Sequence, residues 1–204
     1  YIIFFLALFF SKAIAEPTLV QTKAVEAITN FFASALTFNN DGTKMYTSSM
    51  RAAQTGDKVY EYDLTTAYDI STATLRTSLD VGSYPEPGLS NTGNHGAMQV
   101  VFNNDGTKMF IADHNRTIIE WTLTTPYDID TASTTFNLGQ SFDTGGQEKR
   151  PTSVAFNNDG TKMYVAGNEK SNANPGEVNE YTLDNPFVCL LYTSDAADEV
   201  AWGV

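Results

Sequence analysis

The amino-acid sequence predicts an all-β fold built from a repeated antiparallel unit, and three observations lead to this prediction. The nonapeptide FNNDGTKMY occurs three times, once with Phe as its last residue, starting at Phe38, Phe102 and Phe156. The starts are 64 and 54 residues apart (38 to 102 and 102 to 156). Each unit contains four short runs that can be read as strands. Four antiparallel strands repeated at such a period are typical of β-propeller blades.

The first two strands of each unit flank the turn Asn-Asn-Asp-Gly-Thr. We expect first strands at 35–38, 99–102 and 153–156, and second strands at 44–47, 108–112 and 162–166. Asp-Gly between two apolar runs is a strong hairpin signal, because Gly accepts the positive φ that a tight turn needs. The Asp side chain accepts bonds from nearby backbone N–H groups. The predicted structural turn residues are Asp41, Gly42, Asp105, Gly106, Asp159 and Gly160.

The third strands are expected at 60–64, 118–123 and 178–183. Their period-two alternation puts an aromatic residue on one face and a glutamate on the other. The aromatic residues are Tyr62, Trp121 and Tyr181, and the glutamates are Glu61, Glu120 and Glu180. A connection of nearly constant sequence then leads to fourth strands at 74–81 and 134–142. Residues 18–27 look like the fourth strand of a preceding unit, because they too lead into a first strand.

The sequence therefore predicts a β-propeller fragment of about three four-stranded blades within residues 16–187, with repeats starting near 35, 99 and 153. Closed propellers usually have 4 to 8 blades. We accordingly expect an arc that is not closed.

Residues 1–15 read as a secretory signal peptide that lacks its start. An apolar run at 1–10 precedes Ala13-Ile14-Ala15, which predicts cleavage after Ala15. Ten apolar residues are too few to span about 30 Å of hydrocarbon at about 1.5 Å per residue. We expect an exported domain, in the periplasm, on the cell surface or outside the cell, with no membrane span.

Residues 188–204 are predicted to be a non-native tail. The stretch from Cys189 to Glu199 reads CLLYTSDAADE, which resembles a translated sequencing-library adapter. The repeat breaks at the same place, since Val188-Cys189 stands where the first two copies have Asp-Ile. The alternative is a genuine C-terminal strand.

Composition narrows the possible functions. The chain has 24 acidic and 12 basic residues and a formal net charge of −12, which argues against nucleic acid or an anionic membrane as a partner. A hydrophobic content of 42% is enough for a core. A single Cys excludes an intrachain disulfide framework and a Cys-based zinc site.

The repeat F-x-x-D-G-x-x-M/L-Y/F-V resembles that of lactonase-type and Tyr-Val-Thr-Asn-type β-propellers, over about residues 18–187. The resemblance implies a propeller architecture and says little about activity. In the lactonase-like group, Pro-Arg-His often leads into the first strand. The chain has 97–99 (Ala-Met-Gln) and 151–153 (Pro-Thr-Ser) at these positions, so only Pro151 matches. This departure counts against a lactonase.

Loop lengths distinguish the two faces of the predicted propeller. The first-to-second and third-to-fourth connections share one face and hardly vary. On the other face, the repeat Phe and the Leu that ends the third strand are 26, 21 and 27 residues apart (38 to 64, 102 to 123, 156 to 183). Variation confined to one face indicates that this face carries the specific contacts. The alternative is a face that merely tolerates change.

The variable face holds a few residues that suit binding. His, acidic and Arg side chains near the axial opening can do acid–base work or hold an anion, although each can equally be a solvated loop residue. The candidate ligand-binding residues are His95, Asp113, His114, Arg116, Glu148 and Arg150. We interpret the chain as a binding module for a protein, a glycan or a small ligand, without a catalytic residue. The alternative is a lactonase-like hydrolase with an axial active site.

No metal site or cofactor is expected. The chain contains no P-loop, no dinucleotide fingerprint and no Ser/His/Asp signature. Each Asn-Asn-Asp-Gly-Thr copy has one Asp and no downstream Glu, whereas a calcium loop needs several carboxylates. Asn115-Arg116-Thr117 fits a glycosylation sequon, which matters only in a eukaryotic secretory pathway.

Overall fold

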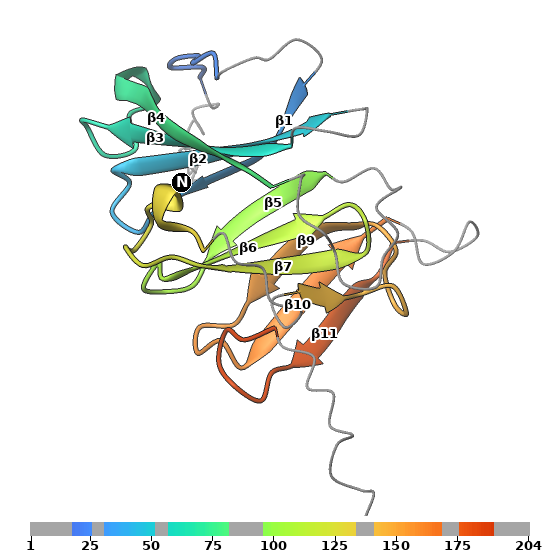
Figure 1. Ribbon diagram of the computed structural model, residues 1–204. Coiled ribbons are helices and arrows are strands. Elements are labelled where there is room, and N and C mark those ends of the chain that lie inside the picture. Colours follow the sequence, from blue (N-terminus) through green and yellow to red (C-terminus); the bar gives the residue numbers. More distant parts are fainter. Residues whose placement is uncertain are drawn as a thin grey trace, which may run out of the picture.

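The computed structural model describes residues 18–25, 31–51, 57–81, 96–133, 141–168 and 176–189, with residues 31, 32, 50 and 51 described by their backbone only. These residues form three antiparallel sheets and two short 3₁₀ helices (Figure 1). The prediction of an all-β fold made of about three propeller blades is confirmed. The signal peptide (1–15), His95 and residues 190–204 of the tail lie outside the described residues.

Blade 1 has the strand order β1-β2-β3-β4 and blade 2 the order β5-β6-β7-β8. The strands of blade 1 are β1 (Phe31–Phe38), β2 (Lys44–Arg51), β3 (Lys58–Leu64) and β4 (Ala73–Asp80), with helix η1 (Ile70–Thr72) before β4. Those of blade 2 are β5 (Ala97–Phe102), β6 (Lys108–Asp113), β7 (Thr117–Thr122) and β8 (Ser141–Asp143), with helix η2 (Ile129–Thr131) after β7.

Blade 3 is described over three strands. Its described strands are β9 (Pro151–Phe156), β10 (Lys162–Gly167) and β11 (Val178–Thr182), in the order β11-β10-β9. Within the described residues, no strand pairs with the outer edge of β11. In blade 2, the predicted fourth strand at 134–142 is described only from residue 141 onward.

The repeat fixes the strand register. Met45 pairs with Tyr62, Met109 with Trp121 and Met163 with Tyr181. In each blade the residue after this Met is aromatic, and it pairs with the glutamate of the third strand. These pairs are Tyr46–Glu61, Phe110–Glu120 and Tyr164–Glu180. Because side chains alternate between faces, every blade has a Met–aromatic face and an opposite face that carries the glutamate.

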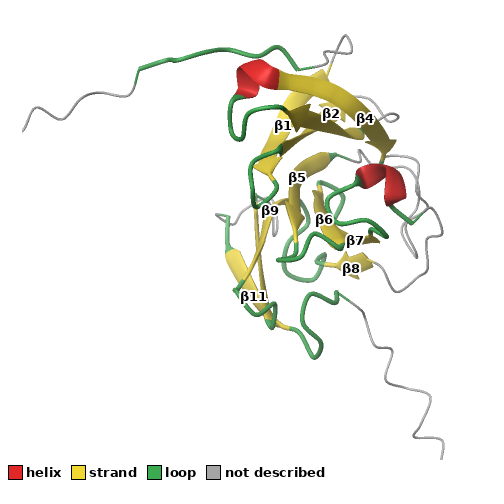
Figure 2. Cartoon of the chain, turned by 90° about the vertical axis from the view of Figure 1, so that its left-hand side faces the viewer, coloured by secondary structure: helices red, strands yellow, loops and turns green. Residues whose placement is uncertain are grey.

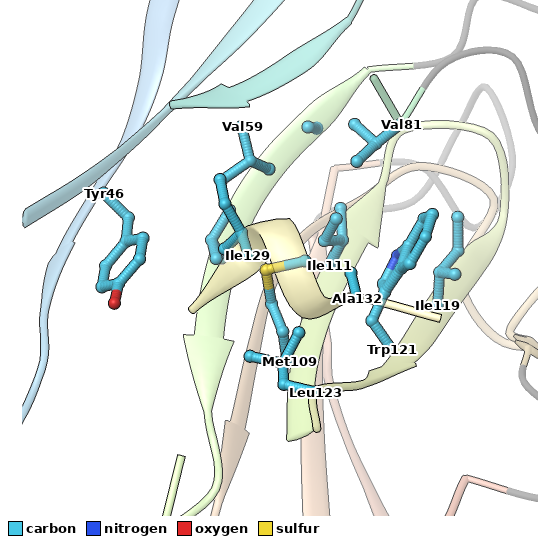
Figure 3. Packing of buried hydrophobic residues seen from close by; sticks show 12 residues of the cluster. Tyr46, Val59, Val81, Met109, Ile111, Ile119, Trp121, Leu123, Ile129 and Ala132 are labelled. Atoms are coloured by element: carbon cyan, nitrogen blue, oxygen red, sulfur yellow. The ribbon is translucent and has the colours of Figure 1, made fainter. Parts of the chain in front are cut away.

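The blades follow one another as an open arc (Figures 1 and 2). The first strands lie side by side, since β5 contacts both β1 and β9. The glutamate face of each blade packs on the Met–aromatic face of the next. Between blades 1 and 2, Tyr46 and Val59 meet a cluster that includes Met109 and Trp121 (Figure 3). Burying such a side chain stabilises the fold by about 1.5–3 kcal/mol.

The second interface repeats the first. Phe110 and Ile118 of blade 2 occupy the positions of Tyr46 and Val59, and both are completely buried. They form one apolar cluster with Val154, Met163 and Val165 of blade 3. The same strand positions therefore build both interfaces.

Residues 18–25 lie in no strand, so the prediction that this segment forms the fourth strand of a preceding unit is wrong for these residues. Their Gln21 Nε2 donates to Asp69 Oδ1 (2.9 Å), and Val25 packs on the Met–aromatic face of blade 1. Val81, at the end of β4, lies in the corresponding cluster on blade 2. The segment thus occupies the place of a preceding fourth strand. The segment forms no ladder of hydrogen bonds, because the described residues include no preceding third strand that could pair with it.

The repeated turns require their glycines. Gly42, Gly106 and Gly160 have φ of +73°, +73° and +71°. A Cβ on Gly106 would lie 2.3 Å from the ring of Tyr127. Asp105 Oδ1 accepts bonds from the backbone N–H (2.9 Å) and the hydroxyl (2.6 Å) of Thr107. Backbone strain and the adjacent ring both exclude a side chain at this position.

Gly106→Ala is expected to lower the free energy of unfolding by about 1–3 kcal/mol, the usual cost of a strained backbone position. Gly146→Ala is the matched control, because a Cβ there has no neighbour within 4 Å. Urea unfolding of both variants measures the difference. Equal stability of the two variants would contradict the account of the turn.

Candidate functional site

The candidate site lies on the face of the arc that carries the loops of variable length, which we call the loop face. The opposite face, with the Asn-Asn-Asp-Gly-Thr turns and the two 3₁₀ helices, is called the turn face. The described part of the loop face includes residues 114–116 between β6 and β7, and residues 144–150 between β8 and β9.

Asp113, at the end of β6, is 3% exposed. Its Oδ1 accepts the backbone N–H groups of Gly96 (3.1 Å) and Asn115 (3.0 Å). These bonds join the entry to β5 to the β6–β7 loop. They commit the carboxylate to positioning this loop.

Arg116 ends the same loop at φ +68°. Its Nη2 lies 3.0 Å from Oδ2 of Asp143 on β8. The two side chains are 40% and 43% exposed, so the pair adds little stability and remains accessible to solvent. The guanidinium packs over Gly145, where a Cβ would lie 2.1 Å from Nε.

Glu148 is completely buried. Its Oε1 accepts the backbone N–H of Arg150 (2.9 Å), and its carboxyl group fills the space beside Gly167. The pKa of Tyr181 is raised, first because its hydroxyl is buried and second because of the negative charge of Glu148.

Thr144 connects the two loops and was not identified in the sequence. Its backbone N–H donates to Arg116 O (2.7 Å), and its hydroxyl bonds to Glu148 O (2.7 Å). Thr144 occurs in no repeat motif, so nothing in the sequence distinguishes it from other loop threonines.

The predicted site residues are thus only partly brought together. Arg116 and Glu148 belong to adjoining loops, and Asp113 lies at the base of the Arg116 loop. His114 is half-buried and donates its backbone N–H to Gly96 O (3.0 Å), and Arg150 is exposed. Convergence at an axial opening stays a prediction. Among the described residues, no group of three or more His, Cys, Asp or Glu side chains could hold a metal ion.

The buried glutamates between the blades have a role that the alternation pattern did not reveal. Glu61 has no exposed surface and pairs with Lys44 and with Arg76 (3.0 Å) of its own blade. Its Oε2 also accepts the backbone N–H of Ile129 in blade 2 (2.9 Å). Glu61 of blade 1 is therefore hydrogen-bonded to the backbone of blade 2.

Glu120 repeats this arrangement between blades 2 and 3. Its Oε1 lies 2.7 Å from Lys108 Nζ, and its Oε2 accepts the backbone N–H of Cys189 (3.0 Å). Cys189, which is 1% exposed, takes the place of Ile129. Any residue except proline can donate this bond, so the contact leaves open whether residues 188–204 are native.

No protein-family model matches the chain, and no curated protein matches it. Among solved structures, the β-propeller domain of Cps50 (Swd1) from Myceliophteria thermophila is similar to this chain, with 14% identity and a TM-score of 0.45. The similarity covers 79% of this chain and 43% of that one, so the chain spans less than half of that structure. Within the described residues, no helix has the length and apolar character needed to cross a membrane.

The lowered pKa values of the three turn carboxylates predict how the free energy of unfolding depends on pH. The pKa values of Asp41, Asp105 and Asp159 are lowered, chiefly by the hydroxyl of the Thr two residues later. A lowered folded-state pKa gives stability that is present above the unfolded pKa of about 3.9 and is lost as pH falls through the folded value. Urea unfolding should show stability falling below about pH 4, and Asp105→Asn should reduce that fall. An unchanged pH profile in this variant would contradict the assignment.

The Glu120 contact gives another prediction. Cys189→Pro removes the N–H that Glu120 accepts, whereas Cys189→Ala keeps it. We expect the proline variant to be less stable than the alanine variant by about 1–3 kcal/mol, the cost of a buried acceptor left unsatisfied. Urea unfolding of the two full-length variants measures this difference. Equal stabilities would show that the bond does not hold blade 3.

Proposed function

We propose that the protein is an exported β-propeller interaction module that binds a polar ligand, on a protein or a glycan or as a free small molecule, through its loop face. The Ala13-Ile14-Ala15 pattern supports export. The carrying observation is that Arg116, in the β6–β7 loop, and Asp143, at the end of β8, form a partly exposed pair beside the hydrogen bonds by which Thr144 joins the two loops.

The turn face is less suited to specific binding because its polar groups serve the repeat itself. In each turn the Asp accepts two bonds from its own Thr, and the first Asn side chain bonds to the Thr hydroxyl (3.1 to 3.2 Å). The second Asn of blades 1 and 2 bonds to the next blade. These groups are the same in all three blades, so they offer no distinctive site.

The loop face, by contrast, places different residues in each blade. Arg116 and Asp143 present donors and an acceptor side by side, which suits hydroxyl, carboxylate or amide groups of a ligand. Thr144 fixes the backbone at Arg116, so little conformational entropy is lost when a ligand binds.

Binding fits this geometry better than catalysis. The candidate acid–base carboxylates Asp113 and Glu148 are 3% and 0% exposed. Asp113 accepts the backbone N–H groups of Gly96 and Asn115, and Glu148 accepts that of Arg150. A general acid or base must lie within hydrogen-bond reach of the substrate. Both carboxylates instead hold the loops in place.

Glycan and peptide arrays probed with the labelled full chain test the proposal. Arg116→Ala and Asp143→Ala should each raise the Kd for a bound probe about tenfold, which corresponds to about 1.4 kcal/mol. Thr124→Ala, an exposed position on the turn face, is the control and should bind as the wild type does. Unchanged binding by Arg116→Ala, loss of binding by the control, or a wild type that binds no probe would contradict the proposal.

A further inference from the structure

The two junctions between neighbouring blades share three contacts. In each junction a buried glutamate, Glu61 or Glu120, accepts a backbone N–H of the next blade. Each junction also has an aromatic pair with ring centroids 4.5 Å apart. An asparagine ladder runs along the turn face, where Asn40 Nδ2 donates to Asn104 O (2.8 Å) and Asn104 Nδ2 donates to Asn158 O (2.6 Å). These contacts belong to the repeat.

The junction between blades 1 and 2 has a further contact, an ion pair between the blades. Arg76 on β4 donates twice to Asp128, the residue before η2, from Nη1 to Oδ1 (2.7 Å) and from Nη2 to Oδ2 (2.9 Å). The two side chains are 30% and 17% exposed. A bidentate and partly buried pair is stronger than an ordinary surface ion pair. Helix η2 is also held against β4 by Thr77, whose hydroxyl donates to Asp130 (Figure 1).

Arg76 connects this ion pair to the buried glutamate. Its Nη1 also donates to Glu61 Oε1 (3.0 Å). Glu61 Oε2 accepts the backbone N–H of Ile129, which directly follows Asp128 in the chain. One guanidinium thus contacts carboxylates of two blades, and the Arg76–Asp128 pair fixes the backbone that donates to Glu61.

Negative charge predominates around Arg76. The charged groups that face each other there are the carboxylates of β3 and η2 and two cations, namely Glu61, Asp63, Asp128, Asp130, Lys44 and Arg76. The nearby phenols of Tyr46 and Tyr127 stay protonated in acid. Four carboxylates against two cations make the bonds from Arg76 to Asp128 the main attraction between charged groups of the two blades.

The ion pair is sensitive to acid. The pKa of Asp128 is lowered, first by the hydrogen bond from Arg76. A lowered folded-state pKa gives stability that is present above the unfolded pKa of about 3.9 and is lost as pH falls through the folded value. A protonated carboxyl group carries an O–H donor on one oxygen and has no charge, so it cannot keep both bonds from the guanidinium.

The junction between blades 2 and 3 lacks both partners of this pair. Residues 134–140, which lead into β8 as the Arg76 segment follows η1, include no charged residue. Val188 stands at the position of Asp128. Lys108 Nζ instead donates to Glu120 of its own blade (2.7 Å) and to Phe187 O of blade 3 (2.8 Å). A carbonyl oxygen does not titrate, so this second contact between blades persists in acid.

We propose that the Arg76–Asp128 pair is an acid-released latch on the junction between blades 1 and 2. While Asp128 is ionised, Arg76 holds η2 against β4 and keeps the N–H of Ile129 on Glu61. When Asp128 takes up a proton, η2 is released from β4 and this junction opens. The junction between blades 2 and 3 stays closed under the same conditions.

Hydrogen exchange of the full chain at neutral pH tests the latch. Asp128→Asn keeps a side-chain oxygen for the N–H of Asp130 but removes the charge, so it imitates the protonated state. The Ile129 amide should exchange at least about tenfold faster than in the wild type, because local opening sets its protection. The Cys189 amide, at the matching position of the other junction, should keep its wild-type rate. Circular dichroism checks that each variant is folded.

Asp69→Asn is the matched control. Asp69 stands before η1 as Asp128 stands before η2, and it accepts the N–H of Ser71 (3.0 Å). Its other side-chain partner is Gln21 (2.9 Å) rather than an arginine. The control variant should therefore leave exchange at Ile129 unchanged.

A pH series and a second background separate the latch from the other carboxylates. The difference between the wild type and Asp128→Asn should shrink as pH falls below about 3.9 and disappear once Asp128 is protonated in the wild type. The turn aspartates are present in both chains, so their protonation cancels in this difference. In an Arg76→Met background, Asp128→Asn should cause no further increase in exchange, since the two residues act as a pair.

Four results would overturn the proposal. The first is an Ile129 amide that exchanges in Asp128→Asn as it does in the wild type. The second is an equal increase in Asp69→Asn or at Cys189, which would show a general loss of stability. The third is a difference between wild type and variant that persists in acid. The fourth is a further increase when Asp128→Asn is added to Arg76→Met.

Discussion

The hydrogen bond from a backbone N–H to a buried glutamate of the preceding blade is the contact on which the stacking of the blades depends. A carboxylate without exposed surface costs several kcal/mol of desolvation unless it is paired and fully hydrogen-bonded. Glu61 obtains charge pairing from Lys44 and Arg76 of its own blade. Its last partner is Ile129 N, which only the next blade supplies. The hydrogen bonds of Glu61 in blade 1 are therefore complete only when blade 2 is in place.

This dependence separates the two faces of the arc. On the turn face, the Asp–Thr bonds, the asparagine ladder and the 3₁₀ helices use polar groups to hold the blades to themselves and to each other. A change there disturbs the stacking, which explains why the turns are nearly identical in all three units. The described part of the loop face carries none of these junction contacts, so its sequence is free to vary. Arg116 and Asp143 are placed there by local bonds such as those of Thr144.

The repeat made much of the fold predictable. Three copies of one nonapeptide indicate the hairpins, and the alternation in VYEYDL places Tyr62 and Glu61 on opposite faces, as the register shows. Alternation alone does not tell which face is buried against a neighbour, so the pattern did not show that Glu61 and Glu120 join blades. The loop site was harder to predict from the sequence than the hairpins, since Thr144 is part of no repeated pattern. Residues 18–25 lead into a first strand, as fourth strands do, but a strand also needs a partner.

The junction also tolerates a change of sequence without a change of geometry. At Val188-Cys189 the side chains no longer match Asp-Ile, yet Cys189 N still bonds to Glu120 and its side chain is as buried as that of Ile129. The donor is a backbone group, and the pocket requires only a small or medium apolar side chain. In the first junction the Tyr46 hydroxyl bonds to Tyr127 O, and in the second Lys108 bonds to Phe187 O. In each junction the following blade contributes backbone donors and acceptors. Different side chains of the preceding blade can therefore form hydrogen bonds with them.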